Sequence, residues 1–413
     1  MSHKPAIQEL ISKIISLRNQ GVNVTLLAIC PNSDAVLEAA VKVAANNEMP
    51  MLFAATLNQV DRGGGYTSWT PHTFVARMEE LAREYNCSSP LYPCLDHGGP
   101  WLKDLHTLEG LNYAETMHEV KETLTACLES GYDLLHIDPT VDRELPDGHS
   151  LGISTVVART VELIVHAEQQ RQRLGRSNIS YEVGTEEVHG GLVDTDNFTS
   201  FLEGLQKGLE KEGLLEVWPS FIVAKVGTDL HTSFFDSKTA LNLYNQVAPL
   251  GSLIKGHYTD WVANPSDYPA SGMGGANIGP EFTATELVAL DELCDQEEEL
   301  YNNGSNLSPS NFRQTLRKSV VDSNRWKKWL FPQEEGKSFD ELIPERQDWL
   351  VSTGARYIWT DPNVLNARQN LYTNLSSVLS DVNGYVVNRV AENIQNYVEA
   401  FNLKGSLELF LET

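Results

Sequence analysis

The sequence predicts an α/β protein: a (β/α)8 barrel, or TIM barrel, followed by a helical C-terminal extension. Eight short apolar segments of strand type alternate with amphipathic helical segments over about 300 residues, which is typical of parallel strands joined by helical crossovers. The rest of the 413-residue chain shows only helical patterns. An open, doubly wound sheet is the alternative, because periodicity alone does not show that a sheet closes.

The eight apolar segments are short and continuous, as expected for strands buried on both faces. They cover residues 24–30, 51–56, 90–97, 133–138, 178–184, 220–227, 252–257 and 274–279. Helix start signals stand between them: Ser33 precedes DAVLEAAVKVAAN, and Thr70 and Pro71 suit the N-cap and the first helical position before HTFVARMEELAREY. We therefore expect a barrel domain over residues 1–304 and a helical extension over 305–413 that packs on the barrel.

Composition and charge exclude several classes of partner. The chain is 41% apolar and carries a formal net charge of −25, which argues against binding to nucleic acid or to an anionic membrane. An anionic metabolite would require the few cations to be gathered in one site. No apolar stretch is long enough to span a membrane, and the N-terminal segment MSHKPAIQELISKI resembles an amphipathic helix rather than a secretory signal. We expect a cytoplasmic protein. The five cysteines contain no close CxxC pair, so neither a disulfide framework nor a structural zinc site is predicted.

Polar residues gather where the predicted strands end. In a (β/α)8 barrel, catalytic groups occupy the C-terminal strand ends and the loops after them. The residues found there are Asp96, His97, His136, Asp138, Glu182, Glu186, Glu187, Asp229, His231, His257, Asp260 and Asn277. The sequence therefore predicts an active site at this mouth, with Asp138, Asp260 and Asn277 among the substrate contacts.

Three histidines from different strands are candidate metal ligands. His97, His231 and His257 each lie at or just beyond the end of a predicted strand, and three imidazoles with open positions suit a divalent ion. Zn²⁺ is the first choice, with Mn²⁺, Co²⁺ and Ni²⁺ as alternatives. His136 stands two residues before Asp138 and is expected inside the barrel wall, as a hydrogen-bond partner behind the site or as a packing residue.

Asp96 and His97 are adjacent in the segment PLYPCLDHGGPW. If His97 binds a metal, the Asp96 carboxylate on the opposite face of the strand can exchange a proton with a substrate hydroxyl. Gly98 and Gly99 leave room for a substrate oxygen near the backbone. The alternative is that Asp96 caps the next helix.

Further candidates lie at the ends of strands two, five, six and seven. Glu182 and Glu186 share one parity, and either could be a second acid/base, since spacing does not choose between them. Lys225 and Lys255 lie inside apolar runs, where a lysine can form a Schiff base, contact a phosphate or pair with a carboxylate such as Asp138. The loop NQVDRGGGYTSWTP, with Asn58 and Gly64, could cradle a sugar or phosphate.

Several motifs, in order, resemble the tagatose-bisphosphate aldolase subunit family of the GatZ/KbaZ type. They are TLNQVDRGGGYTSWTP, CLDHGGPW, YEVGTEEVHGG, DLHTSFF, GHYTDW and NIGPEFT. That family is related to class II, zinc-dependent ketose-bisphosphate aldolases and to barrel sugar epimerases. The resemblance implies that Asp96 is the acid/base, that His97, His231 and His257 bind the metal, and that a strand-five glutamate carries a second proton. His257 is followed by Tyr258, Thr259 and Asp260, whereas class II aldolases typically have a Gly-Gly-Ser phosphate loop there.

The sequence supports three functional hypotheses. The first is a metal-dependent enzyme acting on a ketose or ketose phosphate, an aldolase or a 4-epimerase such as a tagatose/fructose 4-epimerase, since both reactions share a retro-aldol step. The second is a non-catalytic subunit that stabilises a catalytic aldolase partner. The third is a metal-free Schiff-base aldolase that uses Lys225. The expected partners are a sugar or sugar-phosphate substrate and either a homo-oligomer or a catalytic aldolase subunit.

Overall fold

Eight parallel strands close into a barrel in the computed structural model, which describes residues 4–146, 149–185, 193–228 and 234–411. The strands pair in chain order, and β8 closes the sheet by pairing with β1. They are β1 (Leu26–Ile29), β2 (Met51–Thr56), β3 (Leu91–Gly98), β4 (Leu134–Ile137), β5 (Ser180–Gly184), β6 (Phe221–Val223), β7 (Leu253–Gly256) and β8 (Met273–Ile278). The predicted (β/α)8 barrel is confirmed, and the open-sheet alternative is wrong.

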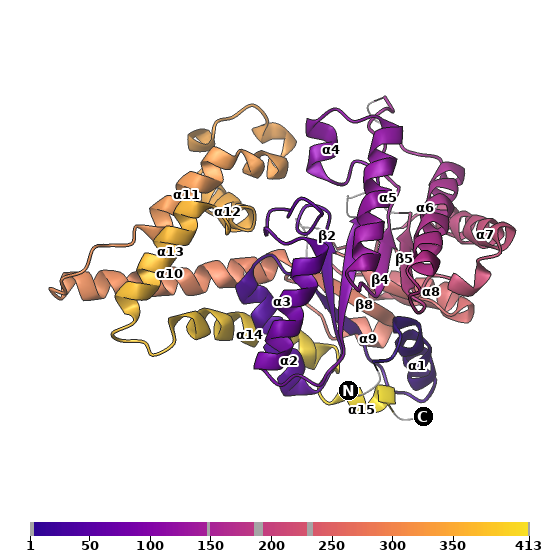
Figure 1. Cartoon of the computed structure of the whole chain (residues 1–413), viewed down its shortest axis with the longest axis horizontal. Helices are drawn as coiled ribbons and strands as arrows, with labels where there is room; N and C mark the ends of the chain where they lie inside the picture. The colour runs from indigo at the N-terminus through magenta and orange to yellow at the C-terminus, as the bar shows by residue number, and fades with distance from the viewer. Residues whose placement is uncertain (1–3, 147–148, 186–192, 229–233, 412–413) are drawn as a thin grey trace.

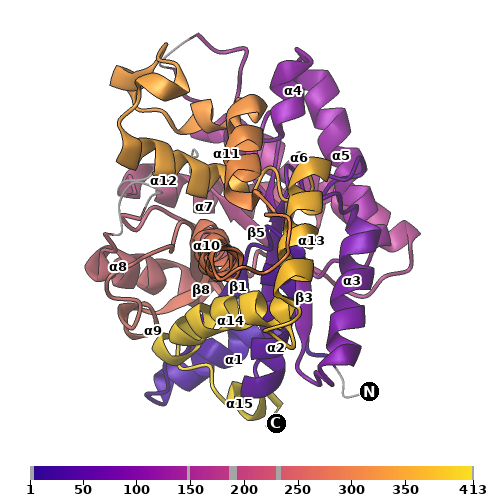
Figure 2. The same ribbon diagram turned by 90° about the vertical axis from the view of Figure 1, so that its left-hand side faces the viewer.

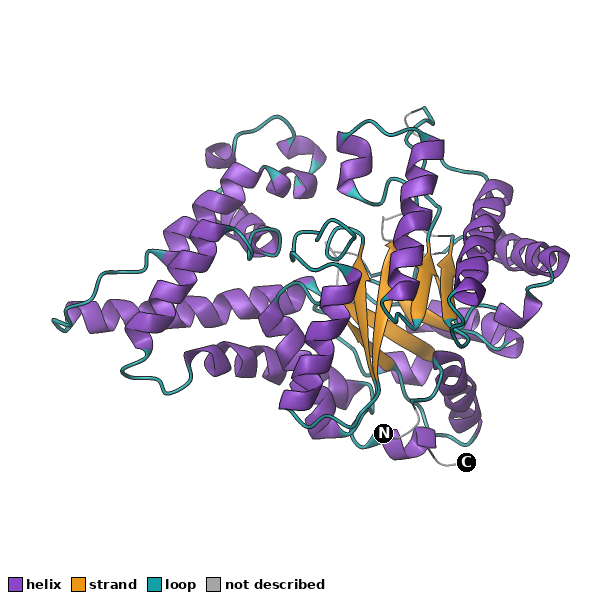
Figure 3. Ribbon diagram, in the orientation of Figure 1, coloured by secondary structure: helices purple, strands orange, loops and turns teal. Residues whose placement is uncertain are grey.

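Helices surround the strands, as Figure 3 shows. Ser33 and Thr70 accept hydrogen bonds from backbone amides at the starts of their helices, as their positions predict. The helices up to β8 are α1 (Ile7–Asn19), α2 (Asp34–Asn47), α3 (Pro71–Glu84), α4 (Asp104–Leu108), α5 (Tyr113–Glu129), α6 (Ile153–Arg173), α7 (Thr195–Glu212), α8 (Ser237–Val247) and α9 (Asp267–Ser271). Among the described residues, no helix is both long and apolar enough to cross a membrane.

A long helix carries the chain away from the barrel and begins the helical C-terminal region. It is α10 (Pro280–Asn302), and Figure 2 views it nearly end-on with the later helices around it. These are α11 (Phe312–Ser323), α12 (Pro344–Ala355), α13 (Pro362–Leu375), α14 (Val382–Ala400) and α15 (Ser406–Leu411). A 3-10 turn at Arg325–Trp329 precedes α12. The C-terminal region is therefore helical, as predicted.

The C-terminal region contacts both ends of the barrel. At the N-terminal end of the strands, α14 packs on α2, and the amide of Thr25 donates a hydrogen bond to the carbonyl of Phe401 at 3.2 Å. At the opposite end, the hydroxyl of Thr360 donates to the carbonyl of Tyr66, in the loop after β2, at 2.9 Å. The region thus reaches the mouth where the predicted site residues lie.

Candidate active site

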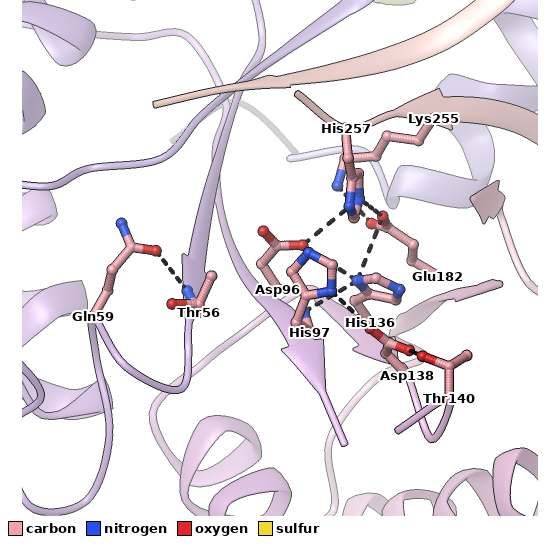
Figure 4. A network of polar contacts seen from close by, with 10 residues as sticks. All are labelled: Thr56, Gln59, Asp96, His97, His136, Asp138, Thr140, Glu182, Lys255 and His257. Carbon is pink, nitrogen blue, oxygen red and sulfur yellow. Dashed lines mark hydrogen bonds and ion pairs between the residues drawn. The ribbon is translucent and has the colours of Figure 1, made fainter. Parts of the chain in front are cut away.

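Seven acidic, imidazole and amine side chains from four strands meet at the C-terminal mouth of the barrel. Figure 4 shows three imidazole rings grouped beside the Asp96 carboxylate, with Glu182 and Lys255 next to His257. The ring centres of His97, His136 and His257 lie 4.8–5.2 Å apart. The seven residues are Asp96 and His97 (β3), His136 (β4) and Asp138 just after it, Glu182 (β5), and Lys255 (β7) with His257 directly after that strand.

The backbone at His97 brings two consecutive side chains to the same site. In a regular strand, Asp96 and His97 would point to opposite faces. His97 instead has a φ of 51°, and the pairing of β3 with β4 shifts register between Leu95 and Gly98. This irregularity turns the imidazole toward the mouth, beside the Asp96 carboxylate. The prediction that the two side chains occupy opposite faces is therefore wrong.

Hydrogen bonds orient the imidazole of His97. Its Nδ1 lies 2.7 Å from a carboxylate oxygen of Asp138, whose other oxygen accepts the hydroxyl of Thr140. A carboxylate that holds one ring nitrogen leaves the other nitrogen, Nε2, available as a ligand. This is the usual arrangement behind a metal-binding histidine.

Glu182 contacts both the amine of Lys255, on β7, and the imidazole of His257. One carboxylate oxygen accepts from Lys255 Nζ at 2.6 Å, and the other lies 2.9 Å from His257 Nε2. Glu182 is 0% exposed and Lys255 1% exposed. Both carboxylate oxygens are therefore occupied and shielded from solvent.

Asp96 lies at the centre of the cluster. Its Oδ1 is 3.2 Å from His136 Nδ1 and 3.7 Å from His257 Nε2. The amide of His97 also approaches His136 Nδ1, at 3.1 Å. One ring nitrogen cannot donate to the carboxylate and accept from the amide at once, so the tautomer of His136 is coupled to the charge of Asp96.

The electrostatics of the cluster keep its carboxylates ionised. Burial alone would raise the pKa of Asp96, but His97 and His257 hold it well below its usual range. Burial likewise opposes ionisation of Glu182, and Lys255 overcomes it and lowers its pKa to about 2. Burial disfavours the imidazolium of His97, yet Asp96 and Asp138 raise its pKa to about 9. Burial lowers the pKa of His257 despite Asp96.

The donor set is consistent with a divalent metal ion. Ligand atoms of Asp96, His97, His136 and His257 all lie within 4.8 Å of one another. Imidazole nitrogen and carboxylate oxygen are the donors that Zn²⁺ and related ions take. The three carboxylates of the cluster face a single lysine, so two negative charges remain uncompensated when the imidazoles are neutral. A divalent cation would balance them.

The sequence of residues 11–401 matches the family described as D-tagatose-1,6-bisphosphate aldolase subunit GatZ/KbaZ-like. The chain belongs to this GatZ/KbaZ-like family. The match covers both the barrel and most of the helical C-terminal region, so the two parts together are a property of the family. The resemblance seen in the motifs is confirmed.

Solved structures share the fold. A probable tagatose 6 phosphate kinase from Sinorhizobium meliloti 1021 is 20% identical, with a TM-score of 0.74 over 91% of this chain and 100% of its own. A fructose-bisphosphate aldolase from Campylobacter jejuni is 12% identical, with a TM-score of 0.56 over 97% of this chain and 95% of its own. The YdjI aldolase from Escherichia coli K12 is 12% identical, with a TM-score of 0.50 over 97% and 98%. At these identities the likeness extends to the fold alone.

Several predicted substrate contacts of this GatZ/KbaZ-like chain have structural partners. Asn58 uses both ends of its amide to hold the loop after β3, with its Nδ2 3.0 Å from the carbonyl of Leu102 and its Oδ1 2.9 Å from the amide of Asp104. Gly64 forms a turn with a φ of 100°. At Gly98 a side chain would stand 2.6 Å from the carbonyl of His136, so this glycine lets β3 approach β4.

The remaining predictions divide into three groups. Asp96, Glu182, His97, His257 and Asp138 lie together in the cluster of Figure 4. Glu186 and His231 lie outside the described residues. Lys225 lies just after β6 and is half-buried, while Asp260 and Asn277 are buried at the mouth beside β8.

Two members of the cluster differ from the sequence prediction. The sequence places His136 inside the barrel wall, yet its ring lies within the group of candidate ligands. Lys255 pairs with Glu182 rather than with Asp138, the partner that the sequence suggests. The sequence does contain a sign that His136 faces the site. It stands two residues before Asp138, and residues two apart in a strand face the same side.

Proposed function

We propose that this chain is a metal-dependent enzyme that cleaves and re-forms a carbon–carbon bond of a ketose or ketose phosphate by retro-aldol and aldol steps. One observation carries the proposal: Asp96 lies at the barrel mouth among His97, His136 and His257, with ligand atoms within 4.8 Å. A carboxylate beside a set of metal-ligating imidazoles is what proton removal from a sugar hydroxyl requires. Membership of an aldolase-subunit family supports the same chemistry.

We assign the metal to His97, His231 and His257, and take Zn²⁺ as the first choice. His97 fits because Asp138 occupies its Nδ1 and leaves Nε2 for the ion. His257 fits because Glu182 occupies its Nε2 and leaves Nδ1 for the ion. When bound, the ion would supply Lewis acidity to the ketose carbonyl, which would stabilise the negative charge that develops on its oxygen as the carbon–carbon bond breaks.

Asp96 is the proposed base and returning acid. It stays ionised despite burial, so it can take the proton of the ketose hydroxyl whose oxygen becomes the new carbonyl. His136, at 3.2 Å, can adjust its tautomer as the charge of Asp96 changes. His136 is therefore proposed as a positioning residue rather than a ligand.

Glu182 is proposed as a second positioning residue. Both of its carboxylate oxygens are taken by Lys255 and His257, and no part of it is exposed. It therefore orients the imidazole of His257 and cannot readily reach a substrate. The second proton carrier is then assigned to Glu186.

A 4-epimerase is the second candidate, and one observation favours it. The C-terminal region contacts loops at the mouth: Arg325 and Lys328 both bind Asp104, and Thr360 binds the loop after β2. If these contacts enclose the substrate, both halves of a cleaved ketose are retained, and rotation of one carbonyl before bond formation inverts C4. Release of the halves would give an aldolase instead.

The test begins with the purified chain alone. Elemental analysis is expected to find about one divalent ion per chain, as for a single catalytic metal site. NMR spectra of fructose 6-phosphate, tagatose 6-phosphate and tagatose 1,6-bisphosphate, recorded with and without chelator, then identify the reaction. Triose products indicate an aldolase, and interconversion of the hexose phosphates indicates a 4-epimerase.

Other outcomes would contradict the proposal. Turnover that survives complete metal removal, with substrate trapped on the chain by borohydride, would favour a Schiff base on Lys225. A metal-replete chain that is silent alone but activates a partner aldolase would assign it the accessory role. Either result would revise the proposed function and not the description of the fold.

A further inference from the structure

A second group of polar side chains at the mouth lies on the side of β8 and β1. It includes Arg356, which lies directly after α12 in the C-terminal region. Arg356 is 5% exposed, and its guanidinium lies 4.9 Å from the ring centres of both Trp329 and Tyr357. Its Nη2 donates to the hydroxyl of Tyr357 at 3.1 Å.

The other terminal nitrogen of Arg356 has nothing to bind. Within the described residues, Nη1 is buried without a hydrogen-bond partner, and no carboxylate forms an ion pair with the guanidinium. Arg368, on α13, is the contrast: it is also largely buried, and Glu286 accepts from its Nη1 at 2.8 Å. Burying a guanidinium without an anion is costly. Arg356 is therefore a buried cation that no carboxylate of the described residues neutralises.

Arg356 is connected to the barrel through two tyrosines. The ring of Tyr357 meets that of Tyr66 edge-on, with centres 5.1 Å apart, and Tyr66 donates to Asn32 Oδ1 at 2.7 Å. Gln59 donates to the same oxygen at 2.8 Å. The carbonyl end of the Asn32 amide is thus used, and its Nδ2 is buried without a partner among the residues that the structure describes.

The amide of Asn32 faces the start of α10. A side chain at Gly279 would stand 3.3 Å from Asn32 Nδ2, and the amide of Gly279 donates to Asp260 at 3.0 Å. Burial raises the pKa of Asp260 to about 7, and Arg356 acts on it in the opposite direction. The geometric link from Arg356 to Asn32 is the chain of contacts through Tyr357 and Tyr66.

Asn277 completes the group on the barrel side. It lies on β8 opposite Ala28 of β1, with the parity of Gly275, where a side chain would stand 3.2 Å from Lys255. Its amide therefore faces the barrel interior. It is 4% exposed, and within the described chain neither its nitrogen nor its oxygen has a partner.

We infer that this group binds the anionic end of the substrate, with Arg356 supplying the charge and Asn32 a neutral donor, while the Asn277 amide takes a sugar hydroxyl. Two buried donors, Nη1 of Arg356 in the C-terminal region and Nδ2 of Asn32 just after β1, have no partner among the described residues, and a phosphate or carboxylate bearing several acceptor oxygens would accept from both. The inference rests on the proposed function for the rest of the substrate. The helical C-terminal region then forms part of the substrate site. Arg356 would supply the positive charge that an anionic substrate requires in this acidic chain.

The first experiment measures anion binding without turnover. Inorganic phosphate is titrated into the full-length, metal-replete protein and followed by thermal unfolding and by ³¹P NMR line width. The wild type is expected to gain a few degrees in Tm at saturating phosphate. Arg356→Gln is expected to lose that gain, and Arg356→Lys, which keeps the charge but loses the planar fork, to retain part of it.

A matched control comes from the same region. Arg346 also packs on aromatic rings, those of Phe331 and Trp349, but its guanidinium is paired with Glu334. Arg346→Gln should keep the full phosphate response, whatever it does to stability. Acetate is titrated in the same way as a carboxylate probe. A wild type that responds to neither phosphate nor acetate, or an Arg356→Gln variant that responds as the wild type does, would overturn the inference.

The second experiment distinguishes a phosphate ester from a carboxylate as the anionic group of the substrate. Turnover of fructose 6-phosphate, of fructuronate and of fructose is compared in the wild type and Arg356→Gln. The kcat/KM for the natural anion is expected to fall about 100-fold, with the neutral ketose changed by less than about threefold. A phosphate-specific loss identifies a phosphate ester, and a uronate-specific loss a carboxylate. An equal loss for all three substrates would overturn the inference. If no ketose is turned over, the phosphate titration still decides it, and only the proposed function fails.

Discussion

The two sides of the barrel mouth satisfy their buried polar groups in different ways. On the side of β3, β4, β5 and β7, each carboxylate of the cluster has an imidazole or lysine within 3.2 Å. On the side of β8 and β1, Asn277 is buried with neither end of its amide paired, and Arg356 keeps one unpaired nitrogen, in the part of the chain that the structure describes.

This difference separates two tasks. A paired network is rigid and sets protonation states in advance, which suits proton transfer and metal binding. A buried amide or guanidinium without a partner costs free energy until a ligand arrives, which suits recognition. Removal of one member should therefore have opposite consequences for stability on the two sides.

The largest effect is expected from Asp96→Asn. This change keeps the shape of the side chain and removes the base, so kcat should fall about 10³-fold while the metal remains bound. Steady-state kinetics and elemental analysis of the same sample check both statements. Asp133→Asn, at the opposite end of the barrel, removes a carboxylate that pairs with Lys4 and should leave kcat nearly unchanged. An Asp96→Asn enzyme within tenfold of wild type would rule out the assigned base.

The paired side is well predicted from sequence, because strands and their polar ends obey simple periodicities. Apolar runs locate the eight strands, and the polar residues at the ends of those runs include Asp96, His97, Glu182 and His257. The same periodicity misplaces His97 relative to Asp96, because the positive φ at His97 breaks the alternation of the strand. Nothing in the local pattern signals such a break.

The unpaired side is only partly accessible from sequence. Asn277 and Asp260 lie at strand ends and are predicted, whereas Arg356 lies about 80 residues beyond the last strand, in a segment with an ordinary helical pattern. Its approach to the mouth depends on how α10 to α13 fold back, and that is long-range packing. Local patterns do not encode such contacts.

Loss of a charge partner should destabilise the paired side. Lys255→Met leaves the carboxylate of Glu182 buried without its cation, and the free energy of unfolding should fall by about 3–5 kcal/mol. Urea denaturation of the metal-free protein measures it. The double variant Lys255→Met/Glu182→Gln should recover much of the loss, since no unpaired charge then remains. A single variant as stable as wild type would show that the pair adds nothing.

Asp260 lies on the side of β8, and its carboxyl group predicts a dependence of stability on pH. Its pKa is about 7 in the folded chain and about 3.9 when unfolded. Between these values the folded chain holds more protons, so stability should fall as pH rises from 4 to 7. Asp260→Asn keeps an oxygen for the amides of Gly279 and Glu281 but cannot ionise. Relative to this variant, the wild type should lose about 2–4 kcal/mol over that range. Parallel pH profiles of the two proteins would contradict the raised pKa.

The smallest predicted effect is a gain in stability from a substitution in the site. Asn277→Leu replaces a buried, unpartnered amide with an apolar group of similar size, so the ligand-free protein should become about 1 kcal/mol more stable. The same change should raise KM for the ketose at least about tenfold, because a hydroxyl loses its partner. Asn47→Leu is the matched control: Asn47 is also buried, but its amide donates to Val43 and Gln395 at 2.9 and 2.8 Å. That substitution should destabilise the chain by about 1–2 kcal/mol. If urea denaturation shows both leucine variants losing stability alike, the amide of Asn277 is already satisfied, and the contrast between the two sides of the mouth does not hold.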